Sequence, residues 1–453
     1  MRVQKLTCFL IHQTSQMSLL DQLTDEQRKA YDLVEQGKSI FLTGPGGTGK
    51  SFLLKTMYEM IPDRRDKHVA VTALTGCAAL LIGRFAKTLH AWAGIGLGRE
   101  SAAVLAATIR RSGKALRRWL GTDILIIDEV SMMTPELLEK LDLIAKTLRR
   151  NSAPMGGIQV VFVGDFYQLP PVNKDKEKET MFVFESPVWH EIVKETVCLT
   201  KLLRQDDPVF HTILDEARKG ALSKKSLDIL ECRTNQPWQQ LAIRPTLLFT
   251  RRAEVDNINE RNLKALGTDK RLFKAETVFA PIEGTKGLTK DSPEVKRIVE
   301  KMDKDGPYMG ELLLAVGAQV MLLTNMDFDT GLVNGSRGVV TGFDSSGAPL
   351  VQFMKGTPIP VPASSWESVD IEGISRKQIP LKLAYAITIH KAQGATLDCA
   401  LIDIGTSTFE CGQAYVALSR VKNLESLYVW DVEPTAFRVH PKVLEFYKQL
   451  NVV

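Results

Sequence analysis

Phosphate-binding chemistry is indicated first by a glycine-rich segment near the start of the chain. The pattern G-x-x-x-x-G-K-S is matched in full by Gly44, Pro45, Gly46, Gly47, Thr48, Gly49, Lys50 and Ser51. Glycines in such a loop let backbone N–H groups curl around a β-phosphate without a clashing Cβ, and the lysine neutralises the β- and γ-phosphates. The serine hydroxyl is placed to ligate magnesium. The segment therefore predicts a site for a nucleoside triphosphate with Mg²⁺.

A pair of acidic residues completes such a site when it ends a neighbouring strand. Asp128 and Glu129 directly follow the apolar run Ile124–Ile127. We expect Asp128 to hold magnesium through water, together with Ser51, and Glu129 to polarise the attacking water as the base. With the catalytic Lys50, these motifs predict nucleotide binding and hydrolysis. They do not separate a motor from a small-molecule kinase.

Three further segments bear on that separation. Gln168 lies in Val163–Pro171, after another apolar run, and is a candidate sensor of the γ-phosphate. Arg204 follows the expected end of the first domain, and Arg420 closes the segment Gln413–Arg420. Two arginines that reach the γ-phosphate from a second domain would stabilise phosphoryl transfer and couple hydrolysis to domain closure. Since a lone arginine is more often a surface residue, the assignment depends on these motif contexts.

The elements that position these residues are short apolar runs without alternation, separated by helical patterns. Such runs are typical of parallel strands covered on both faces, and they predict two doubly wound α/β domains. The expected strands are Ser39–Leu42, Val69–Val71, Ile124–Ile127, Val160–Val163, Thr246–Phe249, Ala400–Asp403 and Leu427–Trp430. Helices are expected over Phe52–Met60 and Pro135–Leu148, the second with Thr134 as its N-cap.

The expected domain organisation follows from a change in amino-acid composition between the two sets of strands. From Lys270 to Pro380 the chain is richer in glycine, proline and charge, with hairpin-like pieces at Ala318–Leu323, Arg337–Val340 and Leu350–Phe353. We expect a flexible leader (1–20), a first domain (21–200) with a short wedge insert (about 94–118), a second domain (201–269 and 380–453) and an inserted β-rich domain (270–379) whose core lies in Gly317–Gly342.

Bulk composition sets wide limits. A chain of 453 residues is too long for one ordinary core, and a net charge of +5 is compatible with a phosphate-rich partner without requiring one. No apolar run approaches the ~20 residues of a membrane-spanning helix, so no membrane partner is expected. The six cysteines show no zinc-binding spacing and are expected to be free thiols. The leader could also be a weak transit peptide.

The ordered set of motifs resembles superfamily 1 helicases, and within them the petite-integration-frequency (PIF) family, which is related to the RecD and Dda-type helicases. The resemblance runs from about Leu23 to about Trp430, and its most family-specific stretch is Glu139–Ala145 through Pro154–Gln159. It implies two RecA-like domains with an SH3-like insertion in the second. It also implies ATP and magnesium as cofactors, and 5′ to 3′ translocation on single-stranded DNA with duplex unwinding.

The resemblance extends to binding residues. Leu23–Gln27 is similar to the adenine-reading glutamine motif, and Thr88–Gly96 is similar to the family's "TLHSFAGIG" segment. The implied nucleotide contacts beyond the phosphate loop are Leu23, Gln27, Phe52 and Gly394. The implied DNA contacts are Thr72, Thr75, Gly76, His90, Trp92, Thr388, His390, Lys391, Gln393 and Tyr415. Ala91 and Ala392 stand where the family often has serine, which puts one hydroxyl contact to DNA in doubt.

Two of these features keep an alternative interpretation. Trp92 could stack on a base, or it could be a core tryptophan between a helix and its neighbour. The basic stretch Arg110–Trp119 could lie beside a duplex junction, next to the expected wedge, or it could be a solvated helix face.

The leading functional prediction is a 5′ to 3′ DNA helicase with roles in DNA repair, replication, recombination and telomere maintenance. The alternative is a DNA-stimulated ATPase that remodels nucleoprotein complexes without separating strands. A P-loop kinase would leave the second half of the chain unexplained. Expected partners are single-stranded and forked DNA, with G-quadruplexes and RNA–DNA hybrids left open. A monomer is expected, in the nucleus or mitochondrion of a eukaryote or in the cytoplasm of a bacterial or viral host.

Overall fold

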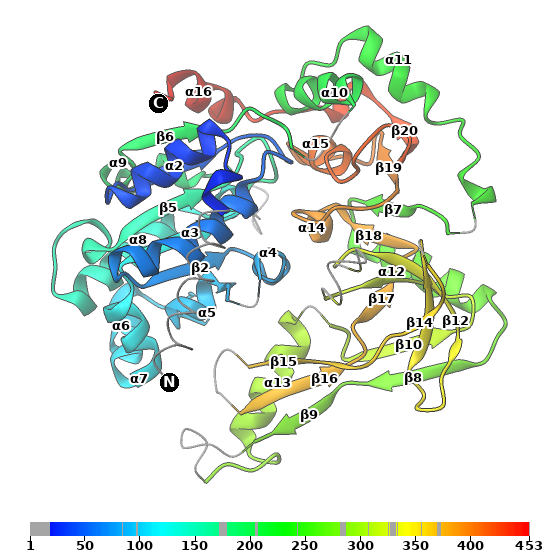
Figure 1. The fold of residues 1–453 in the computed structure, drawn as a ribbon, viewed down its shortest axis with the longest axis horizontal. Helices are drawn as coiled ribbons and strands as arrows, with labels where there is room; N and C mark the ends of the chain where they lie inside the picture. The colour runs from blue at the N-terminus through cyan, green and yellow to red at the C-terminus, as the bar shows by residue number, and fades with distance from the viewer. Residues whose placement is uncertain are drawn as a thin grey trace, which may run out of the picture. The chain divides into compact units, whose positions relative to one another are not determined.

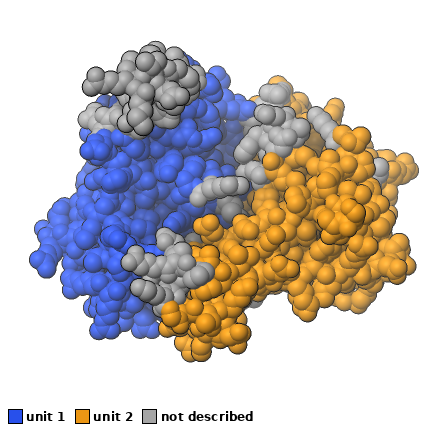
Figure 2. Space-filling model, turned by 60° about the horizontal axis from the view of Figure 1, so that its bottom comes forward, with its two compact units in different colours: residues 1–204, 440–453 blue, residues 205–439 orange. Residues whose placement is uncertain are grey.

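The computed structural model describes residues 19–452 except 84, 97, 172–178, 204–206, 242, 281–286, 307, 325, 327–331, 333, 355 and 369–372. Nearly all of the expected leader lies outside these residues. The chain forms two compact units, residues 1–204 with 440–453 and residues 205–439 (Figure 2). Each unit holds one parallel sheet with helices, as the sequence predicts.

The sheet of the first unit contains every strand expected there. Its six strands lie in the order β3-β2-β4-β5-β1-β6 and pair in parallel (Figure 1). The strands are β1 (Ile40–Thr43), β2 (Val69–Ala73), β3 (Lys87–Thr88), β4 (Ile124–Asp128), β5 (Gln159–Val163) and β6 (Glu195–Cys198). Every residue of β1, β4 and β5 is buried, which explains why these runs are apolar throughout.

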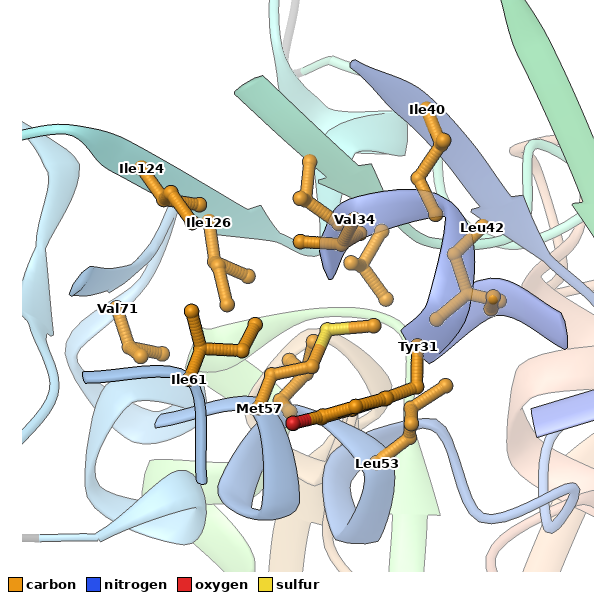
Figure 3. Packing of buried hydrophobic residues seen from close by; sticks show 14 of the residues in the cluster. Tyr31, Val34, Ile40, Leu42, Leu53, Met57, Ile61, Val71, Ile124 and Ile126 are labelled. Carbon is orange, nitrogen blue, oxygen red and sulfur yellow. The ribbon is translucent and has the colours of Figure 1, made fainter. Parts of the chain in front are cut away.

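Helices cover both faces of this sheet. Ile40 and Leu42 point into a core shared with α2 and α3 (Figure 3), whereas the ring of Phe41 packs against Trp189 and Phe446 on the opposite face. Thr134 caps α8, as predicted, by accepting a hydrogen bond from Leu137 N. The helices are α2 (Asp25–Glu35), α3 (Lys50–Arg65), α4 (Gly76–Ile82), α5 (Leu89–Ala93), α6 (Ala102–Arg111), α7 (Gly113–Gly121), α8 (Pro135–Arg149), α9 (Pro187–Ile192) and α16 (Pro441–Gln449).

The second unit is built around a four-stranded parallel sheet in the order β18-β7-β19-β20. Its strands are β7 (Thr246–Phe249), β18 (Ala386–Thr388), β19 (Ala400–Ile404) and β20 (Leu427–Val432). The helices of this part are α10 (Pro208–Lys219), α11 (Lys224–Cys232), α12 (Arg252–Ala265), α14 (Ile389–Ala392) and α15 (Gln413–Leu418). The three strands that the sequence predicts in this part are therefore confirmed.

A β-rich insertion separates β7 from β18 along the chain. Its main sheet has five antiparallel strands: β11 (Gln319–Leu322), β12 (Arg337–Phe343), β13 (Pro349–Phe353), β14 (Ile359–Pro360) and β17 (Leu381–Leu383). Smaller sheets and a helix flank it: β8 (Lys270–Lys274) with β10 (Glu311–Ala315), β9 (Glu276–Phe279) with β16 (Ile374–Gln378) and β15 (Ser364–Glu367), and α13 (Pro293–Asp305). β11 and β12 supply much of its apolar core, as expected for Gly317–Gly342.

The last residues of the chain correct the expected domain boundaries. Residues 440–453 belong to the first unit, although the sequence places 380–453 in the second domain, and the first crossing falls after Arg204 rather than after residue 200. The physical reason is aromatic packing: the ring of Phe446 stacks on Phe184 at 4.1 Å and lies 5.3 Å from Phe166. An apolar stripe on a short terminal helix does not reveal which of two domains it covers.

Candidate active site and nucleic-acid interface

The glycine-rich segment joins the end of β1 to the start of α3 and has the backbone of a phosphate-binding loop. Gly49 has a φ of 81° and forms the N-cap of α3. A Cβ at Gly44 would collide with the carbonyl oxygen of Leu199. The Thr48 hydroxyl donates to the carbonyl of Pro45 at 3.0 Å and closes the turn. Glycine is therefore required at position 49 by the left-handed backbone and at position 44 by the close approach of Leu199.

Lys50 places its ammonium group directly over this loop. Its Nζ donates to the carbonyl oxygens of Gly44 at 2.6 Å and Pro45 at 2.8 Å. Ser51, the next residue in the first turn of α3, is exposed. A cation and a helix N-terminus at one end of a glycine loop fit the phosphates of a nucleotide.

The two acidic residues lie at the end of β4, the strand next to β5 in the sheet. Burial, and then the nearby Glu129 carboxylate, raise the pKa of Asp128 to about 7, while Lys50 acts in the opposite direction. Glu129 adopts a φ of 57°, a left-handed conformation that is costly for a residue with a side chain. Two like charges beside each other in a buried place fit a divalent cation, because its charge would stabilise both carboxylates.

The segment that carries Gln168 begins beside this acidic turn. It follows β5 through Gly164, where an added Cβ would lie 3.0 Å from Val130 N, so the backbone after β5 touches the residue after Glu129. The backbone N–H of Gln168 donates to the backbone carbonyl of Asp165 at 2.9 Å, and the Gln168 side chain is buried. The structure thus places Lys50 and Glu129 close enough to Asp128 to shift its pKa, and the turn that carries Gln168 begins at Gly164, which touches Val130.

Gln27, in the segment Leu23–Gln27, also contacts the phosphate-binding loop. Gln27 completes a capping box at the start of α2, because its Oε1 accepts from Thr24 N at 3.0 Å. Its Nε2 donates to Thr48 O at 3.1 Å. Leu23 and Phe52 are half-buried. The side chain of Gln27 therefore braces the loop, and any contact with adenine stays a prediction.

The two candidate arginines fall in different places. Arg204 lies outside the described residues, but the N–H of its neighbour Leu203 donates to Gly47 O at 2.9 Å. Arg420 belongs to the second unit and is 2% exposed. Its guanidinium donates to Val416 O at 2.7 Å and to Ala395 O at 3.2 Å, next to Gly394. A phosphate contact by Arg420 would require an exchange of these bonds.

The expected DNA contacts of the first unit are only partly accessible. Thr75 caps α4, since its hydroxyl oxygen accepts from Ala78 N at 3.1 Å, and Gly76 begins that helix. The predicted DNA contact of Thr72 is wrong. Thr72 is 0% exposed, and its hydroxyl donates to Ile126 O at 2.8 Å inside the sheet. Position on β2 points this side chain into the sheet layer, where it cannot reach DNA.

The predicted stacking of Trp92 on a DNA base is also wrong. Its side chain is 3% exposed and its ring lies 4.6 Å from that of Trp119, so the alternative of a core tryptophan is the one realised. The guanidinium of Arg118 donates to Trp92 O at 2.7 Å and fastens the end of α5. His90, two residues earlier, is half-buried.

The second unit repeats the arrangement of a threonine between a strand and a short helix. Thr388 ends β18 and caps α14 by accepting from Lys391 N at 3.3 Å. Lys391 is exposed, and burial lowers the pKa of His390. Gln393 is buried, and the predicted DNA contact of Tyr415 is wrong because Tyr415 is 2% exposed within α15. The reason is that all six residues of α15 are buried within the second unit, which the sequence of so short a helix does not reveal.

Comparison with known sequences settles the family. The profile of the PIF1-like helicase family matches residues 22–233, and that of the DNA helicase Pif1 2B domain matches residues 299–343. A crystal structure of Pif1 helicase from Candida albicans is 37% identical, covers 95% of this chain and 99% of that one, and superposes with a TM-score of 0.77. The chain belongs to the Pif1 helicase family.

Pif1 relatives in vertebrates extend beyond this chain. The ATP-dependent DNA helicase PIF1 of Danio rerio is 40% identical over 439 residues, which are 96% of this chain and 65% of the relative. The human protein of the same name is 40% identical over 95% of this chain and 64% of its own length. The chain thus spans just under two thirds of these relatives.

Two solved structures of Bacteroides Pif1 contain a ligand. One, in complex with ADP-AlF4, is 28% identical with a TM-score of 0.74 and covers 94% of this chain and 96% of that one. The other is bound to single-stranded DNA, 29% identical with a TM-score of 0.65 over the same shares. Both support the two-domain Pif1 fold of this chain.

Sequence reasoning missed one residue of the first unit that contacts the site. The hydroxyl of Tyr447, on α16, lies 2.6 Å from Thr43 Oγ1 and 3.3 Å from Asp165 Oδ1. Thr43 precedes the phosphate-binding loop and Asp165 begins the turn that carries Gln168. No motif announces Tyr447, because its role depends on where a distant helix packs.

Proposed function

We propose that this Pif1-family chain is an ATP-dependent DNA helicase that moves 5′ to 3′ on single-stranded DNA. The observation that carries the proposal is the site on the first unit, where Lys50 lies over the glycine loop, Asp128 ends the buried strand β4 and Glu129 follows it, with only β5 between β4 and β1. The relatives named ATP-dependent DNA helicase PIF1 align over 95–96% of this chain. The direction of movement rests on the resemblance to the PIF family.

In the proposed reaction, side chains of the first unit bind the triphosphate and activate water. Lys50 exchanges its bonds to the carbonyls of Gly44 and Pro45 for phosphate oxygens. Ser51 and Asp128 would hold Mg²⁺, which supplies charge neutralisation at the phosphates when it is bound. Glu129 accepts the proton of the attacking water, and Gln168 senses the γ-phosphate. Arg204 and Arg420 are proposed to stabilise the transferring phosphoryl group.

Single-stranded DNA would be held through its backbone by capping threonines. The hydroxyl oxygens of Thr75 and Thr388 accept bonds from helix N–H groups, which leaves each O–H able to donate to a phosphate. Exposed Lys391 adds charge, and His390, whose pKa is lowered, acts as a neutral donor. Contacts of this kind hold DNA without reading its sequence, which suits a translocating protein.

Finer statements about partners belong to the same proposal. Single-stranded and forked DNA are the proposed substrates, since one solved Pif1 structure, from Bacteroides, is bound to single-stranded DNA and another concerns unwinding at forked duplex DNA by two coordinating Pif1 helicases. A monomer inside the cell is the proposed working form. Across the described residues, no helix is both long and apolar enough to span a bilayer.

The test is unwinding of matched DNA duplexes that carry either a 5′ or a 3′ single-stranded tail, with ATP and magnesium. Opening of the 5′-tailed duplex alone, lost in Lys50→Ala, is the expected result, because Lys50 is the cation of the phosphate-binding loop. Opening of only the 3′-tailed duplex would contradict the direction. DNA-stimulated hydrolysis without opening of either duplex would favour an ATPase that remodels nucleoprotein complexes.

A further inference from the structure

The helix α16 closes one face of the first unit from the far end of the chain. Near its start, Lys442 Nζ forms ion pairs with Glu185 at 2.7 Å and Glu179 at 3.0 Å. Near its end, the ring of Tyr447 stacks on Tyr167 with 4.5 Å between centroids and 22° between planes. Since ion pairs and ring contacts together dock the helix, its attachment does not depend on the Tyr447 hydroxyl alone.

That hydroxyl contacts three residues of the first unit. The N–H of Phe166 lies 3.2 Å away and can only donate, and the hydroxyl donates to Asp165 Oδ1 at 3.3 Å. Tyrosine offers one O–H and two acceptor sites. Tyr447 therefore donates to Asp165 and accepts from Phe166 N–H, and the remaining site accepts the Thr43 hydroxyl at 2.6 Å.

The three partners belong to the two loops that form the nucleotide site. Thr43 is the last residue of β1 and precedes Gly44. Asp165 and Phe166 open the turn of Gln168, where Asp165 also accepts Tyr167 N at 3.2 Å through its side chain. Thr43 and Asp165 are separated by 121 residues of chain, so the hydroxyl connects two segments that are distant in sequence.

We propose that Tyr447 is a positioning residue for ATP hydrolysis, which holds the turn carrying Gln168 in register with the phosphate-binding loop. The inference rests on the proposed function. The start of the phosphate-binding loop keeps other support, because Leu199 N donates to Thr43 O at 2.9 Å and β1 pairs with β6 as far as Thr43 and Cys198. The pairing of β1 with β5 ends earlier, at Leu42 and Val163, followed by a bond from Gly164 N to Leu42 O at 3.1 Å. Loss of the Tyr447 hydroxyl would therefore displace the Gln168 turn more than the loop that binds ATP.

The decisive variant is Tyr447→Phe, which keeps the ring contacts and removes only the hydroxyl. We expect kcat for DNA-stimulated ATP hydrolysis to fall about tenfold, less than the ~100-fold that a misplacement of about 1 Å can cost, with KM within twofold of wild type. The matched control is Tyr385→Phe in the second unit, whose hydroxyl accepts from Gln319 N at 3.1 Å and donates to Gly317 O. It should leave kcat unchanged.

Variants of Thr43 provide an independent test of the same proposal. Thr43→Val removes the hydroxyl and should lower kcat as Tyr447→Phe does, whereas Thr43→Ser keeps it and should restore kcat. Tyr447→Phe combined with Thr43→Val should lower kcat little more than either change alone, because both break the same hydrogen-bond network. Rates are measured below the melting temperature of each variant and normalised to folded protein.

An unchanged kcat in Tyr447→Phe would overturn the positioning role, and so would an equal loss in Tyr385→Phe or a loss that appears only in KM. Wild-type protein without DNA-stimulated ATP hydrolysis would instead overturn the proposed function itself. The wild-type measurement therefore separates the two failures.

Discussion

Lys50 and Asp128 show how the first unit keeps opposite charges ready for a nucleotide. Lys50 donates to two loop carbonyls, and phosphate oxygens offer stronger acceptors in the same direction. Burial and the neighbouring Glu129 raise the pKa of Asp128 to about 7, so that carboxylate gains from a bound cation. The residue types could be assigned from the sequence because each must stand at a fixed place in a loop or at a strand end.

Trp92 shows where assignment by residue type fails. An aromatic residue in a DNA-contact motif can present its ring to a base or to the core, and the choice depends on α7, which supplies Trp119. We expect Trp92→Ala to lower the free energy of unfolding by about 3–5 kcal/mol, because it opens a cavity in the core. Denaturant unfolding measures this loss.

Trp92→Phe, which fills more of that cavity, is the control and should lose less. In both variants the folded fraction should bind single-stranded DNA with wild-type affinity. Weaker DNA binding by Trp92→Ala at wild-type stability would show that the ring faces DNA after all.

At the scale of elements, the pair α6 and α7 carries the basic stretch that the sequence left open. Arg118 is structural, because its guanidinium bonds the carbonyls of Ala91 and Trp92, and Arg110 donates to Thr147 O at 3.1 Å. Arg111 and Arg117 are exposed. The structure therefore divides the stretch into arginines that hold the fold and arginines available to a partner.

We expect Arg111→Glu with Arg117→Glu to reduce unwinding of forked DNA several-fold, because like charge repels the duplex phosphates. Hydrolysis stimulated by short single strands should stay at the wild-type level. Arg111→Lys with Arg117→Lys keeps the charge and should unwind normally. Undiminished unwinding by the glutamate variant would identify these arginines as a solvated face.

Element boundaries followed from the sequence where burial is continuous. The runs that form β1, β4 and β5 have no alternation because every residue is buried, and Thr134 marks the start of α8 by its side-chain bond. The docking of α16 could not be predicted in this way. It depends on an aromatic surface assembled from β1, α9 and the turn after β5, which exists only once the first unit is folded.

At the scale of the whole molecule, the division into units predicts where nucleotide binding adds stability. The phosphate-binding loop, the acidic turn, Gln27 and Gln168 all belong to the first unit. A ligand at about 100 times its dissociation constant adds about 2.7 kcal/mol to the free energy of unfolding of the part that binds it. In the absence of DNA, we therefore expect ADP with magnesium to slow amide hydrogen exchange more in β1 and β4 than in β7 and β19.

Exchange followed by mass spectrometry of peptides measures this directly. Helix α16 should share the protection, because Tyr447 connects it to both loops of the site although it lies at the other end of the chain. Lys50→Ala should lose protection in all three elements of the first unit. Equal protection of β7 and β19 would mean that the two units unfold together, and the local effect of the nucleotide would then be wrong. Protection of β1 and β4 without α16 would show that the helix is docked on the unit but not coupled to its site.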